Sequence, residues 1–245
     1  GCGALQGLWR RRPFSCDGMS GADASCRPRR WPALPHFPRR QRHAADQAET
    51  AEMNRLQEVA NALTMLLPFA VAARSLMEEE QPAFGEWLAA AAILIHFPFS
   101  FCYHVSCAYY QESVHPVEGN FGLQLDLAFI HVSSALMSLA TSGSLPWFGL
   151  NALLNGLAVY RIATWSSTAG ERRLLRGVGV LAYILPILVV DARLFLRSLL
   201  IFLSVGFSFA LNGLLAGWGH ALSHVLLAPF AKCILSAAEL APALL

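Results

Sequence analysis

The chain has 245 residues, of which 55% are hydrophobic and only 14% are charged. An ordinary soluble domain is about 45–50% apolar and about 25% charged, so this composition argues against a soluble protein. The net charge of +2 conceals a basic segment, because residues 1–55 contain ten Arg against five Asp and Glu. Nucleic-acid binding is disfavoured, since no aromatic-interleaved motif or folded module accompanies these charges.

The basic segment 1–55 is rich in Arg, Pro, Ala and Ser. A segment of this composition cannot bury enough apolar surface to fold, so we expect a disordered N-terminal arm. It lacks the charged start, apolar middle and small-residue cleavage site of a signal peptide, and its targeting stays open. The six cysteines of the chain include no CxxC pair and predict no disulfide framework.

From residue 56 onward, apolar runs of about 20 residues recur, which is the length that a helix needs to cross a bilayer. They predict an all-α domain over residues 56–240, a bundle of seven transmembrane helices. The expected helices are 56–77, 86–110, 122–142, 146–164, 174–191, 193–214 and 217–239. The turn between the fifth and sixth helices must be very short, because Asp191, Arg193 and Arg197 interrupt one long apolar stretch.

Arginines near helix ends indicate the orientation of the bundle. They cluster before the first expected helix and in the connection between the fourth and fifth helices. In a seven-helix bundle both places lie on one side of the membrane, and Lys and Arg are enriched on the cytoplasmic side. We therefore expect an integral, multi-pass membrane protein with its N-terminus in the cytoplasm and its C-terminus outside.

Five polar residues within the expected spans fall at one level of the bilayer. Ionisable groups are costly there, so each one indicates a function and should face the bundle interior. The second helix carries two of the five near its inner end, the third carries one in its first turns, and the seventh carries two in its first two turns. These residues are Ser100, His104, Asp126, His220 and His224. The coincidence depends on the helix count, because one span more or fewer would separate the two groups.

The spacing of these residues indicates a metal site. Residues four positions apart share one helix face, so His220 and His224 point in one direction, as Ser100 and His104 do. Two imidazoles at this spacing chelate zinc from a helix in metalloproteases. We expect His104 to complete a Zn²⁺ site with this pair, which leaves one coordination position open, as in catalytic zinc sites.

Two further residues have expected catalytic roles beside the metal. Asp126 would orient a water molecule or act as general base, and Ser100 would donate to a developing oxyanion or support a ligand. The remaining polar residues have simpler interpretations. We expect interior hydrogen bonds for His96, a loop position for His115 and no role in the site for His131. Hydrogen bonds between helices are expected for Asn151, Asn155 and Asn212.

The motifs Ser100-xxx-His104, Asp126 and His220-xxx-His224 resemble those of the CREST superfamily of seven-helix membrane proteins, over about residues 56–240. This superfamily unites alkaline ceramidases, progestin and adipoQ receptors, haemolysin III-like proteins, GPI-remodelling proteins, and a GPI-cleaving phospholipase and myomaker branch. The resemblance implies a zinc ion held by the three His, with the Ser and Asp close by as catalytic partners. It also implies metal-dependent hydrolysis of an amide or ester bond in a membrane lipid, with ceramide as one candidate, and leaves the branch open.

Three functions compete at this point. The first is a zinc-dependent intramembrane lipid hydrolase whose substrate enters laterally between helices. The alternative is a receptor or fusion-type membrane protein that keeps the metal for its structure. A third is a channel or transporter that uses the His residues as proton relays, but the sequence lacks the paired interrupted helices that mark many transporters.

Overall fold

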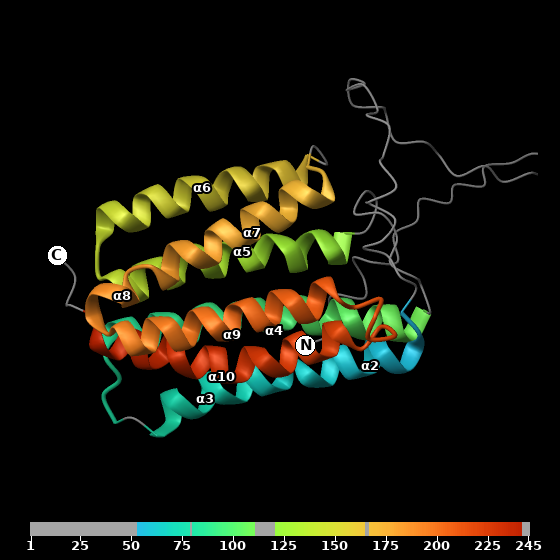
Figure 1. The fold of residues 1–245 in the computed structure, drawn as a ribbon, viewed down its shortest axis with the longest axis horizontal. Coiled ribbons are helices and arrows are strands. Elements are labelled where there is room, and N and C mark those ends of the chain that lie inside the picture. Colours follow the sequence, from blue (N-terminus) through green and yellow to red (C-terminus); the bar gives the residue numbers. More distant parts are fainter. Residues whose placement is uncertain (1–52, 79, 111–120, 165–166, 242–245) are drawn as a thin grey trace, which may run out of the picture. The chain divides into compact units, whose positions relative to one another are not determined.

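The structure, a computed structural model, describes residues 53–78, 80–110, 121–164 and 167–241. Every regular element within these ranges is a helix (Figure 1). Most of the expected arm, residues 1–52, and the connection that contains His115 lie outside the described residues. The all-helical fold class expected from the sequence is therefore confirmed for the part of the chain that the structure describes.

The first expected span consists of two helices in succession, α2 (Arg55–Thr64) and α3 (Leu66–Glu78). A capping box starts α2, because Asn54 and Gln57 each accept a hydrogen bond from the other's backbone N–H, at 3.0 and 2.8 Å. The interruption coincides with Pro68, which has no N–H to donate to the carbonyl four residues earlier. The helical stretch therefore starts and ends within one residue of the expected span 56–77.

The next three helices are α4 (Phe84–Tyr110), α5 (Phe121–Ser142) and α6 (Leu145–Ala163). They agree with the expected spans within two residues at each end. The long helix α4 continues through Pro98. A two-residue turn joins α5 to α6, with Gly143 in the left-handed region at φ 61° and Ser144 accepting a hydrogen bond from the N–H of Trp147 at 3.3 Å.

The last four helices are α7 (Ala169–Ile184), α8 (Ile187–Val190), α9 (Ala192–Ala210) and α10 (Gly219–Leu240). The fifth expected span begins five residues early, because a capping box of Thr168 and Glu171 extends the helix through a polar stretch. The sixth ends at Ala210 instead of 214. The apolar residues that follow form an irregular connection, in which Ala216 and Gly217 have positive φ.

Two features shape the region from α7 to α9. Pro186 separates α7 from α8 and cannot bond the carbonyl of Ala182, which accepts instead from the indole N–H of Trp147 at 2.9 Å. The turn between α8 and α9 is the single residue Asp191. Its carboxylate caps α9 by accepting from two backbone N–H groups at 2.8 and 3.0 Å. The expectation of a very short turn is thus confirmed.

Helix α10 packs against α2, α3, α4 and α9, while α5 contacts α4, α6 and α7 (Figure 1). The apolar core where these helices meet is rich in alanine, which lets helix backbones approach closely. At Gly85 of α4 the approach is close, since a Cβ there would clash with the backbone carbonyl oxygens of Ala238 and Ala140. The apolar core thus clamps α4 to α10 at one end of both helices.

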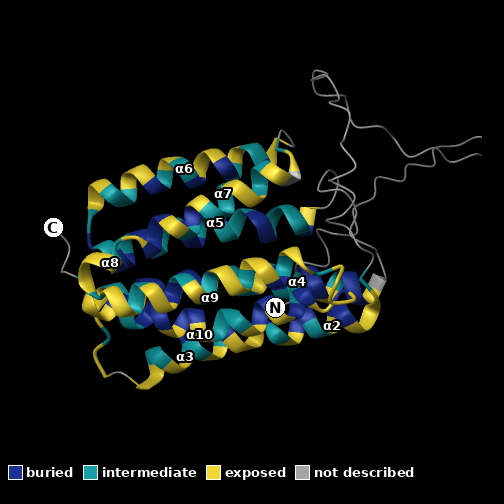
Figure 2. Cartoon of the chain, viewed as in Figure 1, coloured by how far each residue is buried: buried dark blue, intermediate teal, exposed yellow. Residues whose placement is uncertain are grey.

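Among the described residues, six helical stretches are long and apolar enough to cross a membrane. They are Arg55–Glu78, Phe84–Tyr109, Phe121–Ser142, Gly170–Val190, Ala192–Ala210 and Gly219–Leu240. Each carries exposed positions (Figure 2), and many of the exposed residues are large and apolar. Helix α6 is not among the six, because Asn151, Asn155 and Arg161 lower its hydropathy. The structure therefore supports a multi-pass membrane protein with six candidate spans where the sequence predicted seven.

Candidate metal centre

Three imidazoles meet at one end of the bundle, where α4 ends and α10 begins. His104 comes from α4, and His220 and His224 come from the first two turns of α10. One nitrogen of each ring lies within 4.8 Å of the others, and the ring centroids are 4.6 to 5.3 Å apart. Nitrogens bound to one tetrahedral zinc lie roughly 3.3 Å apart, given Zn–N bonds of about 2.0–2.1 Å. Small side-chain movements would therefore bring all three onto one ion.

His104 is fully buried and has only one of its two ring nitrogens hydrogen-bonded. Nδ1 lies 2.7 Å from the carboxylate Oε2 of Glu58 on α2, which we assign as an Nδ1–H donating to the carboxylate. Nε2 has no hydrogen-bond partner among the described residues. A buried polar atom left unpaired costs about 1–3 kcal/mol, so this nitrogen requires an explanation. A metal ion that accepts its lone pair supplies one.

His224 is held in the same manner by the same helix. Its Nδ1 lies 3.1 Å from the backbone carbonyl oxygen of Asn61, to which it donates. The Asn61 side chain in turn donates to Glu58 Oε2 at 3.3 Å, which links the supports of the two imidazoles. Zinc-bound His residues commonly donate their second nitrogen to a carboxylate or a carbonyl, and this orients the ring. Helix α2 therefore supplies the outer contacts of the site.

His220 is placed by the connection between α9 and α10. Its backbone N–H donates to Asn212 Oδ1 at 3.1 Å. Gly219 lets this first turn approach α9, since a Cβ there would clash with the Ser208 carbonyl and the Asn212 backbone. The connection is tied to α2 by Gln57, whose amide donates to the Ala216 carbonyl at 2.6 Å. Asn212, expected to form hydrogen bonds between helices, thus bonds the start of the next helix.

Asp126 and Ser100 lie together beside the three imidazoles. Asp126 on α5 is 8% exposed, and its Oδ1 lies 3.0 Å from His96 Nε2 on α4. Ser100, one turn from both His96 and His104 on the same helix, lies close to the Asp126 carboxylate. The group of metal-ligating atoms that lie within 4.8 Å of one another contains the three imidazoles and not the Asp126 carboxylate. Asp126 is therefore not placed as a fourth ligand. His96 forms the interior hydrogen bond expected of it, with a partner that the sequence did not identify.

His131 belongs to a separate polar contact between α5 and α6. Its Nδ1 lies 2.9 Å from Asn155 Oδ1, and the Asn155 amide donates to the Asn151 carbonyl at 2.9 Å. The expectation that His131 stays outside the site agrees with this arrangement, as does the expectation that Asn155 bonds between helices. The contact satisfies buried polar groups that would otherwise be unpaired.

Glu58 and Asn61 are the two site residues that the sequence analysis did not identify. Both are buried, at 3% and 0% exposure, three residues apart on one face of α2. The sequence did offer an indication for Glu58, because it falls within the expected span 56–77, where an ionisable residue indicates a function. Only the folded chain shows that its partner is His104.

Comparison with models of known protein families, with curated proteins and with solved structures finds no match. The chemistry of the site therefore carries the functional argument. Imidazole nitrogens suit zinc and other late transition metals. Three of them, two with fixed ring orientations, form a donor set that fits one such ion and leaves a coordination position open.

Proposed function

We propose that this chain is a zinc-dependent hydrolase that cleaves an amide or ester bond of a lipid within the membrane. The observation that supports this most is the unpaired, buried Nε2 of His104, which lies beside the His220 and His224 rings while Nδ1 is held by Glu58. Three protein ligands with a fourth position open are typical of catalytic zinc sites, whereas structural zinc sites have four protein ligands.

The surroundings of the three imidazoles fit a divalent cation. Three neutral ligands leave the charge of the ion uncompensated, and buried charge is stable only beside opposite charge. Two carboxylates lie close to the site: Glu58 contacts His104 from α2, and Asp126 contacts His96 from α5. A zinc ion held there would polarise a carbonyl group and make water nucleophilic near neutral pH.

Three side chains around the imidazoles have distinct proposed roles in the reaction. Asp126 acts as the general base, because His96 fixes the position of its carboxylate from α4. Glu58 holds the His104 ring and is already engaged by its Nδ1. Ser100 lies close to the Asp126 carboxylate and can turn its hydroxyl toward a developing oxyanion.

The proposal includes a seventh membrane span, α6, and a cytoplasmic N-terminus. Asn151 and Asn155 are buried and hydrogen-bonded within the bundle, so they need no contact with lipid. The opposite face of α6 exposes Leu150, Leu153 and Leu157. With α6 as a span, the starts of α5 and α10 lie on one side of the membrane, as the site requires. Membership of the CREST superfamily is proposed on the same residues.

Purified full-length protein in lipid nanodiscs would test the function. Zinc content is measured by mass spectrometry, and fatty-acid release is measured on a panel of ceramides and glycerophospholipids. We expect bound zinc and turnover of at least one lipid class. His220→Ala should lose both, whereas Asp126→Ala should lose turnover and keep zinc. His131→Ala, a buried His outside the site, is the matched control and should keep both.

The outcomes separate the competing functions. Zinc without turnover of any lipid in the panel would contradict the hydrolase and favour a receptor or fusion-type protein with a structural metal. A protein that binds no divalent metal would contradict both and leave the proton-relay function.

A further inference from the structure

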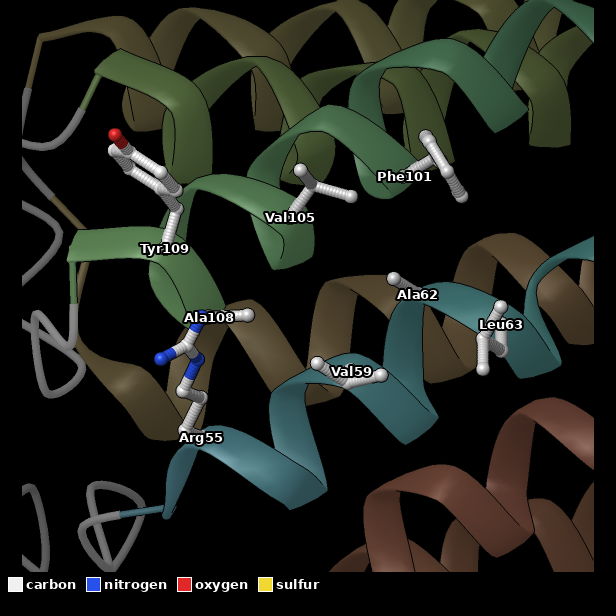
Figure 3. Close-up of a pocket in the computed structure, with 8 residues that line it drawn as sticks. All are labelled: Arg55, Val59, Ala62, Leu63, Phe101, Val105, Ala108 and Tyr109. Carbon is white, nitrogen blue, oxygen red and sulfur yellow. The ribbon is translucent and has the colours of Figure 1, made fainter.

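A groove lies between α2 and α4 (Figure 3). Its volume is about 230 Å³. It is lined by Arg55, Val59, Ala62, Leu63, Phe101, Val105, Ala108 and Tyr109. Glu58 and His104 belong to the metal centre and do not line the groove, so the same two helices contribute to both.

The groove is polar at one end and apolar along the rest. Arg55 is the first residue of α2, and Tyr109 lies one residue before the end of α4. Figure 3 shows the Arg55 side chain extended toward Ala108, on the side of the groove where Tyr109 lies. From Tyr109 the apolar wall continues for eight residues to Phe101, which is about 12 Å along a helix. A cation and a phenol at helix ends sit at headgroup level in a membrane, with the apolar wall below them.

This pattern matches one kind of occupant. A guanidinium pairs strongly with a phosphate, and an apolar slot running from headgroup level toward the membrane interior fits an acyl chain. No acidic side chain of the described residues pairs with Arg55, so the charge is open to an anion. A free phosphate would leave the apolar walls uncovered. An extended peptide would leave backbone N–H and C=O groups unpaired in hydrocarbon.

We propose that the groove binds one anionic glycerophospholipid of the surrounding bilayer, with its phosphate on Arg55 and an acyl chain between α2 and α4. The lipid is a bound partner of the fold and is distinct from any substrate at the metal centre. Its binding depends on the groove residues, none of which is a proposed metal ligand or catalytic residue, so it does not rest on the proposed hydrolase function.

Photocrosslinking would test the site. Full-length protein is placed in nanodiscs with phosphatidylserine or phosphatidylcholine carrying a diazirine in the acyl chain, and the crosslinked peptides are identified by mass spectrometry. Crosslinks should concentrate at residues 55–63 and 101–109 and should be stronger with phosphatidylserine. Arg55→Gln should reduce the preference for the anionic lipid about fivefold, since one arginine near a membrane surface contributes about 1 kcal/mol toward anionic lipids. Val105→Trp should fill the groove and abolish these crosslinks with both lipids.

Two matched variants control for charge and bulk elsewhere on the lipid-facing surface. Arg197→Gln removes an exposed arginine of α9, and Leu153→Trp enlarges an exposed leucine of α6; both should leave the crosslinking pattern unchanged. Circular dichroism and size-exclusion chromatography, measured on every variant, report whether the bundle remains folded. Crosslinks spread evenly over all lipid-facing helices would mean a shell of bulk lipid only and would overturn the proposal. An unchanged lipid preference in Arg55→Gln would overturn it as well.

Discussion

Helices α4 and α10 are packed together along their length, but their two halves differ in chemistry. In one half, Ala89 and Ile93 of α4 belong to the same apolar cluster as Ile234 and Ala238 of α10. In the other half, His104 faces the His pair that begins α10. Apolar contacts need only shape, whereas each buried polar atom needs a specific partner. The apolar half therefore fixes the two helices, so that the polar half can hold groups that are unfavourable without a ligand.

The largest effect on zinc binding should come from removing one of the three His ligands in the polar half. His104→Ala deletes the only imidazole that α4 contributes to the group, and we expect zinc in the purified protein to fall to background. His96→Ala removes an imidazole from the same helix that bonds Asp126, and this variant should keep its zinc. Metal analysis of both variants makes the comparison. Equal zinc contents would break the assignment of His104 as a ligand.

Neutralising Asp126, the proposed general base, should leave the bound zinc in place and reduce kcat. In Asp126→Asn we expect kcat to fall about 10²–10⁴-fold, because a positioned base contributes about that much. The zinc content should stay unchanged, since Asp126 lies outside the group of ligand nitrogens. Steady-state hydrolysis of the lipid identified in the panel is the measurement. A variant with full activity would show that the base is another group.

Removing the contact that Glu58 makes with His104 should have a smaller effect, a loss of metal affinity. Glu58→Gln removes the charge that the Nδ1–H of this ring contacts, and loss of such a contact costs about 10–100-fold in metal affinity. Glu86→Gln is the matched control, because Glu86 is a buried carboxylate that bonds Ser75 at the opposite end of α4. Competition with a zinc chelator of known affinity measures both. A similar loss in the two variants would mean that the effect comes from general destabilisation.

A conservative substitution in the apolar half should have the smallest effect: it should slightly lower the free energy of unfolding and leave zinc affinity unchanged. Ile234 is fully buried in the core, and Ile234→Val should lower the free energy of unfolding by about 0.5–1.5 kcal/mol. The zinc affinity of the folded protein should not change. Unfolding in mixed detergent measures the stability, and Leu153→Val at an exposed position of α6 serves as the control. A parallel loss of zinc affinity would show that the two halves are more closely coupled than proposed.

The sequence predicted the all-helical fold and the approximate bounds of most helices, because the length of each apolar run is a property of the chain itself. The convergence of His104 with His220 and His224 could be anticipated from depth and four-residue spacing alone. The predicted start of α7 and end of α9 were wrong, because hydropathy does not mark either boundary. A capping box extends α7 into a polar stretch, and the connection after α9 is irregular although its residues are apolar. The support from Glu58 could not be predicted, because it depends on how α2 is rotated against α4.

The three imidazoles belong to one early helix and to the last helix of the chain, with most of the bundle between them in sequence. An ion held by all three would act as a crosslink that closes a long loop of the polypeptide. A ligand bound only by the native state adds RT ln(1 + [L]/Kd) to stability, about 2.7 kcal/mol at a hundredfold excess over Kd. Zinc supply would then govern how long the folded protein survives in its membrane, quite apart from whether it turns over a substrate.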